Sequence, residues 1–203
     1  PAACVSMNQY SRFDGNNPLI LNNSRTNGNT QTAGMVQGNP FLATGSARII
    51  VNQVNGNLAR INNSIEIAGP RSELIIAAPA GIIVNGGTII NASRTTLTTG
   101  TPIINGGSLE GYRVTQGQIS VDGSGLDTSQ SDYTDILARS VQANAGIWAQ
   151  NLNIVTGANQ IDRNNSATAI AGEGATPAYA LDSSALGGMY ANKITFIGTE
   201  KGL

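Results

Sequence analysis

The stretch LIIAAPAGIIVNGGTIINASRTTLTTG (74–100) is the part of the sequence that says most about the fold. It places four short apolar segments within fewer than thirty residues, and small corner residues separate them. Asn and Gly tolerate left-handed backbone conformations, so they allow sharp corners between short strands. Such strands fit a chain that coils so that each turn stacks on the previous one, with Ile, Val and Leu inside. The stretch therefore predicts an all-β protein, a right-handed parallel β-helix with extra-helical loops or short antiparallel strands.

The same pattern continues along the rest of the chain. Within the opening stretch, GIIVNG (81–86) and GTIINAS (87–93) are predicted as separate strands. Residues 131–150 could form an amphipathic helix, but their small residues favour strands in DILARSVQAN (135–144) and GIWAQNLNIVTG (146–157). Four Asn-Gly pairs keep a β-sandwich as an alternative, because this dipeptide favours two-residue hairpins. Other predicted strands are ARIIVNQV (47–54), SIEIAG (64–69), GQISVDG (117–123) and NKITFIG (192–198).

The composition limits the possible functions. Charged residues make up 11% of the 203 residues, histidine is absent and the net charge is -1. No long-range positive field exists to gather nucleic acid or anionic lipid, so we expect no nucleic-acid partner. We predict one domain over residues 1–203, a fragment of a larger processed protein. A loop excursion is expected at 157–188, and residues 22–38 form a second polar, glycine-rich interruption.

Candidate catalytic and metal-binding groups are few. Without histidine the usual triads and zinc sites are missing, and the lone Cys4 has no partner base and no disulfide partner. The acidic residues of 122–135 do not have the spacing of a calcium-binding loop, so we predict that they form a solvated loop. We expect no catalytic residue, no metal site and no cofactor in this protein. A polysaccharide-active β-helix enzyme stays an alternative hypothesis. The acidic cluster comprises Asp122, Asp127, Asp132 and Asp135, and Arg139 is its nearest base.

The segment GNPFL (38–42) is a candidate recognition sequence. Asn39-Pro40 predicts a turn, since proline lacks a backbone donor and disfavours helix in the residue before it. In one interpretation Phe41 and Leu42 pack under a corner, while the Asn39 side chain bonds to the local backbone. In the other, a partner binds the segment by adding it as a strand to a sheet edge. The two interpretations are compatible.

The ordered segments resemble a known family, the secretion domain of two-partner-secretion exoproteins. That family includes filamentous haemagglutinins and contact-dependent growth inhibition toxins. The segments that carry the resemblance are VSMNQYSRF (5–13), LILNNS (19–24), GNPFL (38–42), IIVNQVNG (49–56), IEIAGPRSELIIAAPAGI (65–82), NGGTIINASRTTLTTGTP (85–102), DILARSVQANAGIWAQNLNIVTGANQI (135–161) and ALGGMYANKITFIGTEKGL (185–203).

The resemblance implies a right-handed β-helix at the N-terminus of a large secreted adhesin or toxin. It implies a non-enzymatic targeting module, recognised in the periplasm by the POTRA domains of an Omp85-class outer-membrane transporter. Folding at the cell surface would then nucleate further β-helix. A cell-surface adhesion domain that binds its own receptor or glycan is the alternative function. A receptor on a host or neighbouring cell is a further expected partner of the full-length protein.

Two motifs of the family fall on this sequence. Its Asn-Pro-x-Leu motif aligns with Asn39, Pro40, Phe41 and Leu42, which are the expected transporter-recognition residues. Its Asn-Pro-Asn-Gly-Ile motif falls on Ala78, Pro79, Ala80, Gly81 and Ile82, where alanine replaces both asparagines. Any polar role of those asparagines is therefore lost here, and the ordinary reading of this segment is a turn.

Overall fold

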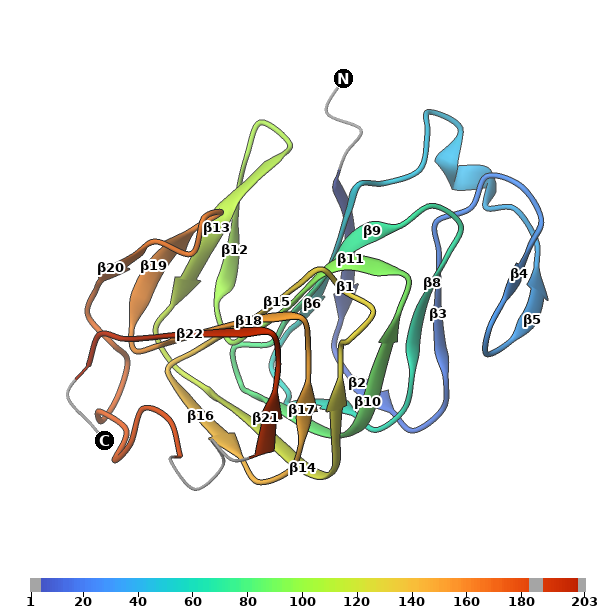
Figure 1. The fold of residues 1–203 in the computed structure, drawn as a ribbon. Coiled ribbons are helices and arrows are strands. Elements are labelled where there is room, and N and C mark those ends of the chain that lie inside the picture. The colour runs from blue at the N-terminus through green and yellow to red at the C-terminus, as the bar shows by residue number, and fades with distance from the viewer. Residues whose placement is uncertain (1–4, 183–187, 201–203) are drawn as a thin grey trace.

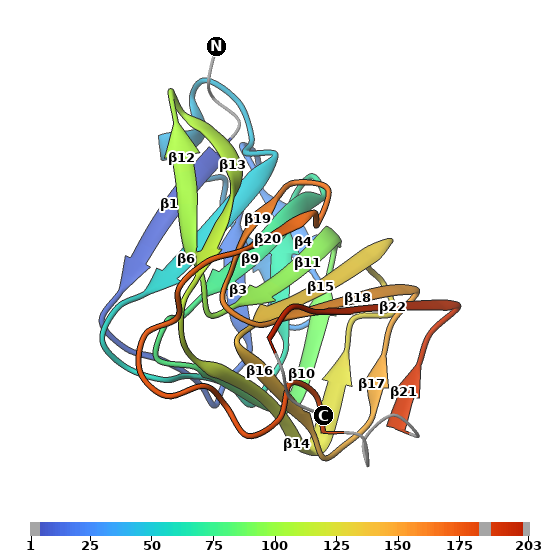
Figure 2. The same ribbon diagram turned by 90° about the vertical axis from the view of Figure 1, so that its left-hand side faces the viewer.

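The computed structural model describes residues 5–182 and 188–200. The chain coils into a parallel β-helix with a three-sided cross-section, and successive turns stack along one axis (Figures 1 and 2). Parallel pairing holds neighbouring turns in register, so that Asn8 lies beside Asn52 and Ile136 beside Ile154. The prediction of a right-handed parallel β-helix with short extra-helical antiparallel strands is confirmed.

One side of the β-helix, the first face, is a parallel sheet with seven strands among the described residues. Its strands alternate between residues that point into the β-helix and residues that point outward. In chain order they are β1 (Val5–Tyr10), β6 (Ile49–Val54), β9 (Ser72–Ala77), β11 (Ala92–Thr98), β15 (Tyr133–Ala138), β18 (Asn151–Thr156) and β22 (Lys193–Gly198).

The other two sides consist of shorter strands and two long, bent ones. β10 (Ile82–Ile90) pairs with β7 (Ala59–Ile61) through its first half and with β8 (Ile65–Ala68) through its second half, so it crosses a corner. The predicted strands GIIVNG and GTIINAS are therefore one continuous strand, because Gly86 takes the corner with a positive φ of 84°. The remaining strands are β2 (Phe13–Gly15), β3 (Leu19–Asn22), β14 (Gln118–Asp127), β16 (Ser140–Ala143), β17 (Ile147–Trp148) and β21 (Met189–Tyr190).

Insertions leave the β-helix at its corners. The first carries a hairpin, β4 (Gly28–Thr30) and β5 (Gly34–Val36), followed by the short 3-10 helix η1 (Pro40–Leu42). The second is the hairpin β12 (Thr101–Asn105) and β13 (Ser108–Val114), and the third holds β19 (Asn159–Asp162) and β20 (Ala167–Ala169). The last two insertions pair into one antiparallel sheet, β12-β13-β19-β20. Within the described residues no helix is long and apolar enough to cross a membrane.

The middle strands of the first face, such as β9, are buried on both sides of the sheet. Its inward residues, such as Leu74 and Ile76, pack in the interior of the β-helix. Its outward residues Val51 and Ile75 form a second apolar cluster with residues of the antiparallel sheet, which lies over this face (Figure 1). Burial on both sides explains why ELIIAA (73–78) is nearly continuously apolar rather than alternating. The antiparallel sheet contributes Leu109, Tyr112, Val114 and Ile161 to this second cluster.

Candidate recognition site and the polar clusters around it

Asn39 fixes the start of η1. Its Oδ1 accepts the backbone N–H of Phe41 at 3.0 Å, and its Nδ2 donates to the carbonyl of Asn22 at 3.0 Å. Pro40 follows at the first helical position, where a missing N–H costs nothing and the fixed φ suits a helix. The predicted turn with a locally bonded Asn39 side chain is therefore correct.

Phe41 and Leu42 have different environments. Leu42 is half-buried and lines a cavity of about 220 Å³ with Tyr10 and Ile50 at the first turns of the β-helix. Phe41 is 92% exposed, the most exposed large apolar side chain among the described residues. The interpretation that both side chains pack under a corner is thus wrong for Phe41, because the Asn39 cap and Pro40 turn this position away from the protein.

Ala78 to Ile82 form a corner between the first face and β10. The Gly81 N–H donates to the Ala78 carbonyl at 2.9 Å, which closes the predicted turn. Ala78 and Ile82 are fully buried, whereas Ala80 is exposed. The carbonyl of Pro79 accepts Nε2 of Gln116 at 3.3 Å. This segment is a structural corner that receives the end of the second insertion.

The predicted acidic cluster is dispersed. Asp122 accepts Nδ2 of Asn144 at 2.7 Å, and Asp132 lies 3.5 Å from a nitrogen of Arg71. Asp127 accepts the N–H and the hydroxyl of Ser129, two positions along the chain. No group of three or more acidic, Cys or His side chains that could hold a metal ion occurs in residues 5–182 and 188–200.

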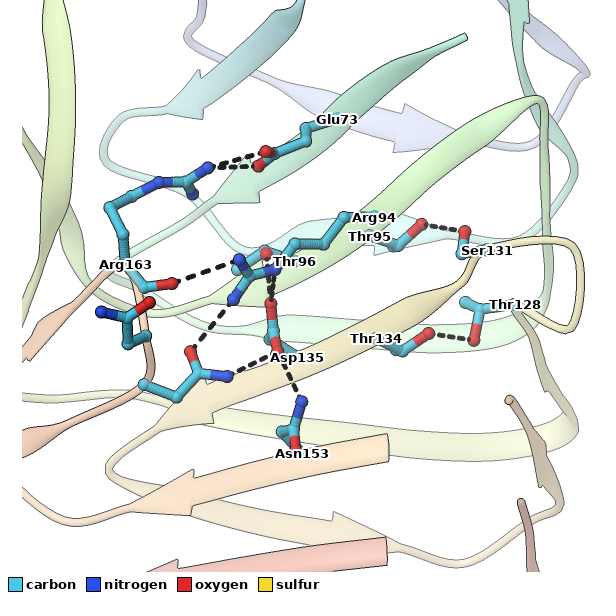
Figure 3. Close-up of polar contacts among 12 residues, drawn as sticks. Glu73, Arg94, Thr95, Thr96, Thr128, Ser131, Thr134, Asp135, Asn153 and Arg163 are labelled. Atoms are coloured by element: carbon cyan, nitrogen blue, oxygen red, sulfur yellow. Dashed lines mark hydrogen bonds and ion pairs between the residues drawn. The ribbon is translucent and has the colours of Figure 1, made fainter. Parts of the chain in front are cut away.

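Asp135 contradicts the prediction of a solvated loop. It points outward from β15 and is fully buried, where its carboxylate pairs with Nε of Arg94 at 2.5 Å (Figure 3). Nδ2 of Asn165 donates to it at 2.8 Å, and Thr96 at 3.0 Å. A second ion pair, between Arg163 and Glu73 at 2.6 Å, lies beside it. The inserted segment around Arg163 covers this part of the first face and removes Asp135 from water.

Arg139, the base nearest to the acidic cluster in the sequence, is buried in the structure. Its side chain is only 5% exposed and faces the carboxylate of Glu200, 3.0 Å away. The two residues are 61 positions apart, so the sequence alone does not indicate that they pair.

A family model described as the TPS secretion domain matches residues 2–203. The chain belongs to this family. The resemblance stated from the sequence is therefore confirmed. All the sites described above lie within this TPS secretion domain. The solved structure of the filamentous hemagglutinin secretion domain is similar at a TM-score of 0.89 and 34% identity. That match covers 99% of this chain and 71% of the solved one.

Curated relatives of this TPS secretion domain are much longer proteins. Toxin CdiA of Yersinia pestis is 50% identical over 98% of this chain, and tRNA nuclease CdiA-2 of Burkholderia pseudomallei is 50% identical over 100%. 16S rRNA endonuclease CdiA of Enterobacter cloacae is 41% identical over 98%. The chain spans only 6–7% of the length of these relatives.

Two anchors of the first insertion in this TPS secretion domain were not predicted from the sequence. The buried Asn23 accepts the N–H of Ala47 at 2.7 Å and donates to the carbonyl of the same residue at 2.9 Å. Glu66 is 4% exposed and accepts the N–H groups of Gln31 and Thr32, at 2.7 and 2.9 Å, at the tip of the β4–β5 hairpin. The sequence signal for this anchor was that Glu66 is the single charged residue in the predicted strand SIEIAG (64–69).

Proposed function

We propose that this TPS secretion domain is a non-enzymatic targeting module for the export of a large secreted adhesin or toxin. Its partner is an outer-membrane transporter of the Omp85 class, whose POTRA domains bind the chain in the periplasm. The module then folds at the cell surface and nucleates the β-helix that follows. The family match and the relatives named CdiA toxins support the export role.

The observation that carries the recognition proposal is the exposure of Phe41. A phenyl ring in water is unfavourable, and the short helix η1 nevertheless holds it away from the β-helix. Asn39 and Pro40 fix the backbone at this point, so a partner would meet a preformed contact and lose little chain entropy on binding. The bond from the Phe41 N–H to the Asn39 side chain joins residues two positions apart, so this local turn does not need the folded β-helix and is available on the chain in the periplasm. Phe41 is the residue that the transporter contacts there, and Asn39 and Pro40 hold it in place.

The open end of the first face supports nucleation. Ile194 and Phe196 in β22 are in register with the buried Leu152 and Ile154, yet they are 42% and 45% exposed. A further turn stacked on β22 would cover them and pair with the edge of β22 that no strand in residues 5–182 and 188–200 occupies. Each added turn then forms against a preformed neighbour, so only local contacts are needed at each step.

Binding of the purified domain to the purified POTRA domains of its transporter tests the recognition proposal. We expect Phe41→Ala to weaken this binding at least about tenfold, since aromatic anchors are common hot spots. Unfolding in urea should show unchanged stability for this variant, because the removed ring contacts little of the protein.

The matched control is Met35→Ala, which removes an apolar side chain that is 71% exposed on β5. It should bind as tightly as the original chain. Equal binding by Phe41→Ala and the original chain, together with normal secretion, would exclude Phe41 as the contact.

A further inference from the structure

Arg139 joins segments that are far apart in the sequence. Its Nε and Nη2 donate to the two carboxylate oxygens of Glu200 at 3.1 and 3.0 Å. Its Nη1 donates to the backbone carbonyl of Glu173 at 2.6 Å and to that of Thr115 at 3.3 Å. The guanidinium therefore contacts the second insertion, the third insertion and the residues after β22 at once.

The residues around Arg139 and Glu200 pack closely and add further polar contacts. Arg139 is 5% exposed, and a Cβ atom at Gly172 would lie 2.3 Å from Nη2, so a side chain there would displace the guanidinium from its present contacts. Glu200 also accepts the N–H of Ala158 at 3.2 Å, where the third insertion leaves β18. Thr199 adds a hydroxyl bond of 2.7 Å to the buried Asn159.

The segment 170–174 has little else to hold it. Ile170 is half-buried, and the four residues after it are exposed. Its backbone bonds are those of the Ile170 N–H to Ala158 and of the Glu173 N–H to Thr115. Because the segment buries little apolar surface, its order depends on the polar contacts around Arg139.

We propose that the Arg139–Glu200 pair is a closing latch, which docks segment 170–174 only when residue 200 lies against the β-helix. The two residues are 61 positions apart, so a chain threaded through a pore in either direction can form the pair only when both have passed. Until then Arg139 is a charge at a buried site with no carboxylate partner, which disfavours the closed arrangement. The timing of this docking during export rests on the proposed function. The docking of segment 170–174 by the Arg139–Glu200 pair does not.

Amide hydrogen exchange on the full chain tests the latch. In Glu200→Ala we expect the N–H groups of Ile170 and Glu173 to exchange faster by on the order of 100-fold, because a buried charge loses its partner. Amides of β15 and β18 should keep their protection. Glu110→Ala is the matched control, since that exposed carboxylate accepts only Nδ2 of Asn105 in the described structure, and it should change neither set.

Unchanged exchange at Ile170 and Glu173 would overturn the latch. Equal acceleration of all amides would also overturn it, because the pair would then support only global stability. A second measurement compares Glu200→Ala in the original chain and in Arg139→Met by urea unfolding. The shift in midpoint should be clearly smaller in the Met background, and equal shifts would contradict the coupling.

Transporter binding separates the latch from the recognition proposal. POTRA binding by Glu200→Ala should match the original chain, because Phe41 lies on a different insertion. If the original chain did not bind POTRA domains, the recognition proposal would fail, whereas the exchange result would still decide the latch. In secretion assays, Glu200→Ala should reduce the yield of protease-resistant domain at the cell surface while Phe41→Ala reduces export itself.

Discussion

Nδ2 of Asn153 donates to Oδ1 of Asp135 at 3.1 Å, one turn further along the β-helix (Figure 3). The two side chains occupy equivalent outward positions of β18 and β15, beneath the third insertion. The stacked register of the β-helix thus places polar side chains where they can satisfy one another when an inserted segment covers them. A buried carboxylate is tolerated here because donors surround it.

Replacing Asp135 should be strongly destabilising. We expect Asp135→Ala to lower the free energy of unfolding by about 3 kcal/mol, since Arg94 loses its carboxylate and the donors of Thr96 and Asn165 lose their acceptor. Urea unfolding measures the loss. Asp132→Ala, at a side chain that is 55% exposed, should change stability by less than about 0.5 kcal/mol. Similar costs for both variants would contradict the assignment of Asp135 as a buried anchor.

Tyr112 should make stability fall at high pH. Burial raises the pKa of Tyr112 from 10.0 to about 12, and its hydroxyl has no hydrogen-bond partner among the described residues. The unfolded chain loses this proton at lower pH than the folded one, so stability is constant below about pH 10 and decreases towards pH 12. The decrease is about 2 to 3 kcal/mol for two pKa units.

Tyr112→Phe should remove this part of the pH dependence. Stability at pH 7 should be equal or higher, because a buried hydroxyl without a partner is removed. A smaller decrease above pH 10 should remain from Tyr10, whose pKa is also raised by burial. An unchanged pH profile of the unfolding free energy in the Phe variant would exclude Tyr112 as its source.

Glu66 should control the β4–β5 hairpin. In Glu66→Gln one acceptor oxygen becomes an NH₂ group that faces a backbone donor, so we expect the N–H groups of Gln31 and Thr32 to exchange about tenfold faster or more. Amides of β8 should keep their protection. Glu110→Gln, at an exposed carboxylate, is the control and should leave the hairpin unchanged. Full protection of the hairpin tip in Glu66→Gln would show that other contacts hold it.

Gly117 should not tolerate a side chain. Its φ is +94°, and a Cβ atom would lie 2.6 Å from Cβ of Thr99 and 2.7 Å from the carbonyl oxygen of Pro79. We expect Gly117→Ala to cost at least about 2 kcal/mol of unfolding free energy. Gly28→Ala is the matched control, because nothing lies within 4 Å of its Cβ position and its φ is not positive. An equal cost at both glycines would show that contacts at the Pro79 corner do not matter.

Most strands were predictable because a β-helix is a local pattern. Ile and Val runs that end in Gly or Asn gave the strands and corners, including those in residues 131–150 that could have been helical. The break predicted between GIIVNG and GTIINAS was wrong, since Gly86 bends the backbone without ending the hydrogen-bonded ladder. At the recognition motif, the Asn39 turn was predictable, but the exposure of Phe41 was not.

The coiled arrangement of the strands follows from local features of the sequence, because strand period, β-branched residues and corner residues act over a few neighbouring positions. It did not distinguish Asp135 from Asp132, although one is fully buried and the other exposed. This difference arises in the tertiary structure, since the burial of Asp135 depends on an inserted segment that returns from about thirty residues away. The same holds for Arg139 and Glu200, whose charges meet only when the turns of the β-helix have stacked.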